Sequence, residues 1–225
     1  MTEQHEFQTP SLQEFYLRLV RETAEGIQRR VCDACGIPLN PKTASECQPI
    51  PVFEEAKLSL LASANIKAPT EIKWATSYSH EYVLAYFKRY RLPGERRIRN
   101  EIVVTTNNYC VARFFAAKEL MHCFLDEDGH TSTSSIGLVH DLIDDLVAGG
   151  SLSQQRAPQT IVDEIAWMGA VYYLIPDSWV PILQSAQSAI QLQRPDVNST
   201  LHLAQQIRVP ENVLRVRLRR DRTVV

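Results

Sequence analysis

Three ionisable residues stand within one helical turn near the middle of the sequence, in the stretch Lys118-Glu119-Leu120-Met121-His122. In a helix, residues four apart share a face, so Lys118 and His122 are neighbours and Glu119 lies next to them. The spacing is that of the His-Glu-x-x-His zinc pattern, in which two His hold the metal and the Glu activates a metal-bound water. Lys118 stands where this pattern has its first His.

The elements around this stretch are expected to position it. Hydrophobic periodicity predicts a helix over residues 109–125, preceded by a β-branched strand over 101–106 and an Asn-Asn turn. A second important helix is expected over 159–176. Further helices are predicted over 11–35, 52–64, 79–90, 137–150, 178–193 and, as a pair around Arg208-Val209, 199–219, with loops over 37–51, 126–137 and 151–158. The fold class is therefore predicted to be α+β, predominantly helical, with one small sheet.

The composition is that of an ordinary soluble globular protein. The chain has 225 residues, of which 44% are hydrophobic and 22% charged, and its net charge of −2 favours neither nucleic acid nor an anionic membrane surface. No apolar run approaches the roughly 18 residues of a membrane span, and the first residues lack the apolar region of a secretory signal. Five cysteines, an odd number, favour a reduced, cytoplasmic protein over a disulfide framework.

Taken in order, these pieces resemble the ImmA/IrrE family of zinc metallopeptidases, which act on repressor-type transcription factors in bacteria and their mobile elements. The family pattern is a strand, an Asn-rich turn, an Arg-Phe pair and an Ala-His-Glu-x-x-His helix, followed by a Glu-x-x-Ala-Asn/Asp helix and a closing Leu-Ala, Val-Ser/Pro, Arg-Leu segment. The matching positions, within roughly residues 98–219, are Arg113, Phe114, Ala117, Glu119, His122, Asp163, Ala166, Ala170, Pro176, Leu203, Ala204, Val209, Pro210, Val213, Arg217 and Leu218.

The resemblance implies a zincin-like core with a small sheet and a C-terminal helix pair. It implies a metallopeptidase-like domain over residues 96–225, preceded by a helical N-terminal subdomain over 1–95. Three departures fall on the metal shell, because Lys118 replaces the first His, Asp163 the third-ligand Glu, and Trp167 the Asn or Asp four residues later. The implied site residues are Glu119 as catalytic base, His122 and Asp163 as metal ligands with Glu164 and His130 as alternates, and Arg113 and Trp167 as supporting residues.

Lys118 changes what such a site can bind. A protonated ammonium about 4 Å from a divalent metal repels it by about 8 kcal/mol at an effective dielectric near 20. That repulsion would offset much of the roughly 10–16 kcal/mol with which structural zinc is bound. The ammonium can instead replace the metal charge and pair with Glu119 and Asp163, which is what a buried lysine requires. Zinc is therefore expected to bind weakly or not at all.

Three hypotheses for function follow. The favoured one is a degenerate, metallopeptidase-like protein that binds a protein partner, such as a DNA-binding transcriptional regulator, without cleaving it. The second is an active zinc metalloprotease that cleaves such a regulator with an altered ligand set. The third is a nucleic-acid-binding protein that uses the basic segments 88–99 and 215–222. A solvated helix face explains those segments more simply, so direct nucleic-acid binding and membrane binding are not expected.

Overall fold

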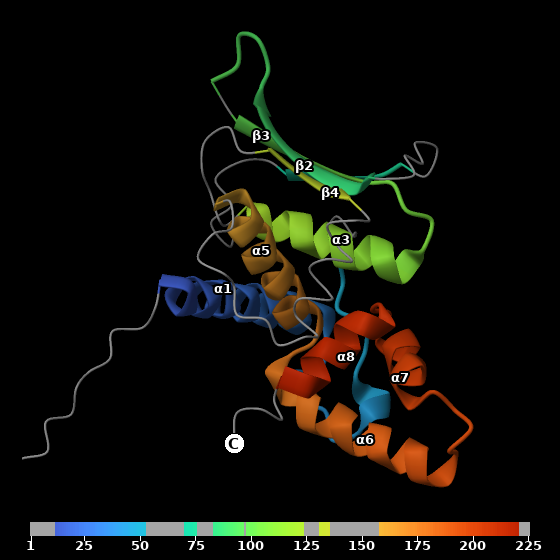
Figure 1. Ribbon diagram of the computed structural model, residues 1–225. Coiled ribbons are helices and arrows are strands. Elements are labelled where there is room, and N and C mark those ends of the chain that lie inside the picture. The colour runs from blue at the N-terminus through green and yellow to red at the C-terminus, as the bar shows by residue number, and fades with distance from the viewer. Residues whose placement is uncertain are drawn as a thin grey trace, which may run out of the picture.

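The computed structural model describes residues 12–52, 70–75, 83–96, 98–123, 131–135 and 158–220. Figure 1 shows a small sheet lying over one helix, a helical layer beneath that helix, and a group of C-terminal helices at the far end. The mixed α and β architecture predicted from the sequence is confirmed at this level. Among the described helices, none combines the length and apolar character needed to cross a membrane.

Helix α3 (Tyr109–His122) lies at the centre of the molecule. Its N-cap is Asn108, whose side-chain oxygen accepts a hydrogen bond from the Val111 backbone N–H at 3.1 Å. From Ala112 to His122 every residue is buried, so this helix has no solvent face. Each charged side chain on it must therefore find its partner inside the protein.

The sheet has the strand order β1-β3-β2-β4, built from β1 (Thr70–Trp74), β2 (Val83–Arg91), β3 (Ile98–Val104) and β4 (Thr131–Ser135). Strands β2 and β3 form an antiparallel hairpin, β1 pairs with β3 in parallel, and β4 pairs with β2 antiparallel. Ala85, Phe87, Ile102 and Val104 are buried, and β2 and β3 both contact α3. One face of the hairpin thereby covers the central helix.

Helix α5 (Pro158–Leu174) packs against α3, and α1 (Leu12–Cys35) packs against α5. Gly169 permits this close approach, because a Cβ there would lie 2.8 Å from Met121 Cγ and 2.9 Å from Val20 Cγ2. Helix α1 buries Val20, Ala24, Ile27 and Val31 at helical spacing. It ends at Cys35, and the next residue, Gly36, has a φ of +66° that allows the Ile37 N–H to reach the Cys32 carbonyl.

The C-terminal helices are α6 (Val180–Gln193), α7 (Ser199–Ile207) and α8 (Glu211–Arg220). They contact one another, and the 3-10 turn η1 (Ala44–Glu46) contacts α6. A second 3-10 turn, η2 (Asp177–Trp179), joins α5 to α6. The predicted helix pair over residues 199–219 is confirmed as α7 and α8.

Two sequence predictions are wrong. The helix expected over residues 79–90 is strand β2 from residue 83 onward, and its burial follows the two-residue period of a strand, with Ala85 and Phe87 inside and Lys88 outside. The Pro93-Gly94 pair forms the hairpin turn, with Gly94 at φ +84° and the Glu95 N–H donating to the Leu92 carbonyl at 3.0 Å. The loop expected over residues 126–137 contains β4, an edge strand at Thr131–Ser135.

The remaining predictions divide between described and undescribed residues. The helices expected over 52–64 and 137–150 lie outside the described residues, apart from residue 52. Strand β1 was not predicted. The domain boundary expected at residues 95–96 falls in the turn between β2 and β3, two hydrogen-bonded strands of one sheet.

Candidate functional site

Helices α3 and α5 bring four ionisable side chains into one buried cluster, which consists of Lys118, Glu119, His122 and Asp163. Lys118 Nζ lies 2.9 Å from Asp163 Oδ2 and 3.4 Å from Glu119 Oε1. His122 Nε2 lies 3.0 Å from Asp163 Oδ1 and 3.9 Å from Glu119 Oε2. The i,i+4 spacing on α3 sets Lys118 and His122 side by side, and Asp163 on α5 contacts both through its two oxygens.

The buried cluster is shielded from water. The exposed fractions are 2% for Lys118, 0% for Glu119, 1% for His122 and 8% for Asp163. Burial on its own raises the pKa of the Asp163 carboxyl, but the hydrogen bond with His122 and the positive charge of Lys118 outweigh it. The net effect holds the pKa of Asp163 below its ordinary value, so this carboxylate is ionised at neutral pH.

The sheet contributes one further contact to the buried cluster. The ring of Phe87, on β2, stacks against the His122 imidazole with the ring centroids 6.0 Å apart and the planes inclined by 16°. The sheet and α5 lie on opposite sides of α3, so Phe87 covers the imidazole from the side of the sheet. Because the sequence predicts a helix over residues 79–90, it gives no sign that Phe87 belongs to the site.

Arg113 and Trp167, the two supporting residues, lie at separate places. Arg113 is buried on α3 and donates through Nη1 to the carbonyl of Arg208 at 3.1 Å and through Nη2 to the carbonyl of Ile50. It therefore ties the end of α7 and the residue-50 loop to the central helix, and burial lowers its pKa from the ordinary value. Trp167 is buried on α5 and packs edge-on against Phe114, with centroids 5.5 Å apart.

Of the two alternate ligands, only Glu164 lies within the described residues. Glu164 is buried on α5, one residue beyond Asp163 and turned about 100° around the helix. His130 lies outside the described residues. Within the described ranges, no group of three or more His, Cys, Asp or Glu side chains has an arrangement that could hold a metal ion.

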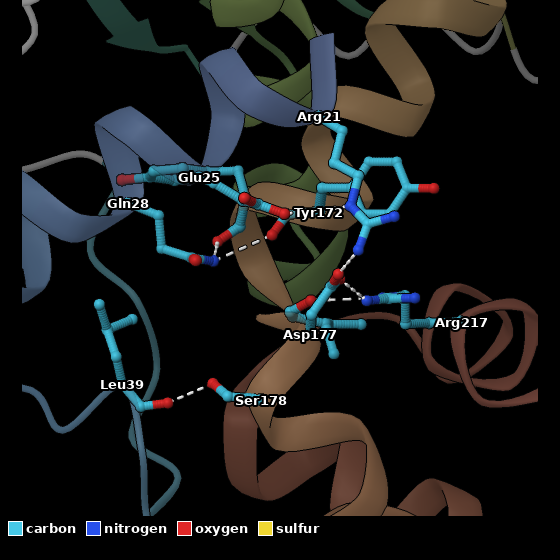
Figure 2. A network of polar contacts seen from close by, with 10 residues as sticks. Arg21, Glu25, Gln28, Leu39, Tyr172, Asp177, Ser178 and Arg217 are labelled. Carbon is cyan, nitrogen blue, oxygen red and sulfur yellow. Dashed lines mark hydrogen bonds and ion pairs between the residues drawn. The ribbon is translucent and has the colours of Figure 1, made fainter. Parts of the chain in front are cut away.

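A second set of charges, the Asp177 cluster, joins Arg21, Asp177 and Arg217 at the junction of α1, η2 and α8. Figure 2 shows both guanidinium groups directed at the Asp177 carboxylate, with the Tyr172 ring beside them. The Arg217 and Arg21 guanidinium carbons lie 5.0 Å and 5.4 Å from the centroid of that ring. Sequence periodicity carries no signal for this cluster, because its members are 40 or more residues apart.

Gln28 adds a polar contact next to the Asp177 cluster. Its side-chain amide donates to the carbonyls of Tyr172 at 2.9 Å and Tyr173 at 2.7 Å, both in the last turn of α5 (Figure 2). These two carbonyls belong to the helix end that has no intrahelical donors left. Gln28 therefore fixes α1 against the end of α5.

The chemistry open to the buried cluster follows from its contacts. One ammonium touches both carboxylates, and an imidazole completes the contacts of Asp163. The lysine faces two carboxyl groups, and almost none of the group's surface reaches solvent. A substrate could meet these side chains only if the residues covering them moved away.

Comparisons with known protein families, with curated proteins and with solved structures find no match to this chain.

Proposed function

We propose that this chain is a degenerate ImmA/IrrE-like protein that binds a protein partner, such as a transcriptional regulator, without cleaving it. The observation that carries the proposal is the position of the Lys118 ammonium. It lies between the two carboxylates that the family resemblance assigns to the metal and its water, 2.9 Å from Asp163 and 3.4 Å from Glu119. A cationic side chain there supplies the positive charge that the carboxylates require.

The residues present do not fit a catalytic zinc. Such a site takes three neutral or anionic protein ligands and leaves a fourth position for water. Here one ligand position carries an ammonium, which cannot donate an electron pair while protonated. With Lys118 directed into the cluster, a dication between Asp163 and His122 would lie next to a positive charge in a site of low dielectric.

The arrangement of elements supports a zincin-like core. The sheet covers α3, which carries the Lys-Glu-Leu-Met-His stretch, and α5 crosses below with Asp163 at the position of the third ligand. The pairing of Lys118 with Asp163 would preserve that crossing without metal. The nature of the partner rests on the family resemblance alone.

The cytoplasm is the proposed location. All five cysteines lie within the described residues and all are free thiols. Cys32 and Cys123 are buried, and desolvation raises the pKa of each to about 12. Unpaired, protonated thiols are typical of proteins in a reducing compartment.

The experiment pairs a cleavage assay with a binding assay. The purified chain, with and without added zinc, is incubated with casein and with candidate repressor-type regulators, and the products are followed by gel electrophoresis and mass spectrometry. We expect no cleavage and an intact 1:1 complex with the true partner on size-exclusion chromatography.

The matched control is Glu119→Gln, which keeps the size of the side chain and removes its basicity. Under the proposal, the native chain and the variant leave every substrate intact to the same extent. Zinc-stimulated cleavage by the native chain that Glu119→Gln abolishes would establish the active protease instead. That alternative draws on the position of His122, whose Nε2 lies 3.0 Å from Asp163 Oδ1 and 3.9 Å from Glu119 Oε2.

A further inference from the structure

Among the described strands, the turn end of the β2–β3 hairpin extends past β1 and β4 as a two-stranded ribbon. Pairing with β4 extends to Lys88, opposite Thr131, and pairing with β1 begins at Asn100, opposite Thr70. Within the described part of the sheet, the hairpin beyond these positions pairs only with itself, through Tyr90 opposite Arg99 and Arg91 opposite Ile98. Figure 1 shows the turn of this hairpin reaching away from the helices. We refer to residues 88–99 as the basic ribbon.

The basic ribbon carries a strong local charge. It contains six basic residues and one acidic residue, in a chain whose net charge is −2. Its exposed basic side chains include Lys88, Arg91, Arg96 and Arg99. Glu95, the single acid, is engaged by Arg99 through contacts of 2.8 to 3.1 Å. The rest of the chain is acidic overall, so the positive charge is concentrated on this projection.

Positive charge is present on both faces of the basic ribbon. Successive side chains of a strand alternate between faces, so Arg89 and Arg91 follow Phe87 on the face towards α3. Lys88 lies on the opposite face, and Arg99 shares that face because it pairs with Tyr90. The observed contacts agree, since Arg89 lies over the Phe87 ring and Lys88 over the Tyr90 ring.

We propose that the basic ribbon binds duplex DNA through the phosphate backbone, with the hairpin in the major groove. That groove is about 12 Å wide and admits a two-stranded β-ribbon. A ribbon in it lies between two phosphate strands, so cations on both faces of this ribbon can approach phosphate oxygens. An acidic protein surface would contact only one face. A-form RNA offers a narrow major groove that side chains do not enter, so DNA is the better fit.

This inference is independent of the buried cluster. Arg91 and Arg96 are exposed on the ribbon whereas Lys118 and Asp163 are buried between α3 and α5, so DNA binding and the metal question can fail separately. The sequence predicts Lys88 and Arg89 at the end of a helix over residues 79–90, and the other basic residues of the segment in the turn that follows it. The strand geometry is what distributes them over two faces.

The test is fluorescence anisotropy of a labelled DNA duplex of about 20 base pairs, titrated with the full chain at 50 to 200 mM salt. We expect dissociation constants of about 10⁻⁴ to 10⁻⁶ M at physiological salt and tighter binding below it. Arg91→Glu with Arg96→Glu should weaken binding at least about tenfold and flatten the log–log salt slope by about 2.

The matched control is Arg29→Glu with Arg194→Glu. Both arginines are exposed and lie outside the ribbon, and the pair changes the net charge by the same amount. The control should bind DNA within about threefold of the native chain. Thermal melting establishes that both double variants are folded, since all four side chains are exposed.

Four outcomes would overturn the proposal. No DNA binding at 50 mM salt would do so, as would equal losses in the ribbon and control variants, which indicate net charge alone. Equal affinity for duplex RNA of the same sequence would exclude insertion in the major groove. If polyglutamate displaces the DNA at matched charge, the basic ribbon is a binding site for an acidic protein instead of DNA.

Discussion

Two clusters of charge join helices in this protein, and they differ in their access to water. In the buried cluster, Lys118 and Asp163 have side chains that are 2% and 12% exposed, and Glu119 and His122 have none exposed. In the Asp177 cluster, Arg217 is 3% exposed, but Asp177 is 34% and Arg21 48% exposed.

The difference lies in what happens when one partner is removed. At Asp177, water can replace a lost guanidinium, because the carboxylate already reaches solvent. At Asp163 and Glu119 it cannot, so each charge depends on the others for compensation. Lys118 is therefore expected to be a buried cation that the fold requires, whereas Arg21 is a half-exposed partner that water can replace.

The largest effect is expected from Lys118→Met, which leaves two buried carboxylates without their cation. The free energy of unfolding should fall by about 3–5 kcal/mol at pH 7, measured by urea denaturation. Adding Asp163→Leu removes one of the stranded charges, so the double variant should be more stable than the single one. A loss below about 1 kcal/mol would show that the cluster is not sealed from water.

The second prediction tests the helix crossing that brings the buried cluster together. Gly169→Ala places a methyl group against Met121 and Val20 at the contact of α5 with α3 and α1. Overpacking of this kind costs about 1–3 kcal/mol. Gly26→Ala is the matched control, because a Cβ there meets nothing within 4 Å. It should leave stability unchanged or slightly raised, and equal melting temperatures for the two variants would contradict the close approach.

The third prediction compares the two arginines on Asp177. Arg217→Met removes a buried partner of Asp177 and should cost about 2 kcal/mol, the range for hydrogen bonds to charged groups. Arg21→Met removes a half-exposed partner and should cost less than about 1 kcal/mol. Denaturant midpoints of the two variants are measured at 0.1 M and 1 M salt. Added salt should reduce the loss of stability caused by Arg21→Met but not that caused by Arg217→Met. Equal costs would remove the distinction drawn here.

The fourth prediction concerns the stability contribution of Asp163, which changes only as the pH falls well below neutral. The pKa of Asp163 is lower in the folded chain than the unfolded value of about 3.9. The unfolded state therefore takes up this proton first as the pH falls. The stabilisation is complete above the unfolded pKa and is lost as pH falls through the folded pKa. The stability difference between native and Asp163→Asn chains should be constant from pH 8 to pH 5 and should shrink below about pH 4. If the stability difference between the two chains grows in acid, the pKa of Asp163 is not lowered by folding.

The sequence predicted the helices better than the sheet. Helical periodicity identified α1 and the C-terminal pair, because each has apolar residues at fixed spacing over several turns. Helices α3 and α5 were identified from long apolar runs with turn residues at their ends. Strand β2 was mistaken for a helix because Val83, Leu84, Ala85 and Phe87 suit both periods over a short run. The Pro93-Gly94 pair forms the turn of the β2–β3 hairpin, but such a pair is also typical of a helix end.

The buried cluster was partly accessible from sequence. The i,i+4 spacing of Lys118 and His122 requires them to be neighbours on any helix, and the family resemblance added Asp163. The stacking of Phe87 on His122 depends on which strand packs over α3. A local sequence pattern does not specify this tertiary contact. The Arg113 contacts with the end of α7 are likewise set by tertiary packing between segments nearly a hundred residues apart.

The central claim, that the Lys118 ammonium stands in for a metal, is tested most directly by zinc stoichiometry. Native, Lys118→His, and Lys118→His with Asp163→Glu chains are loaded with zinc, dialysed against metal-free buffer and measured by elemental analysis. Lys42→His adds a histidine at an exposed site as the control. We predict far less than one zinc per native or control chain, with zinc rising in the single variant and further in the double variant. One retained zinc per native chain, lost on His122→Ala, would contradict the account.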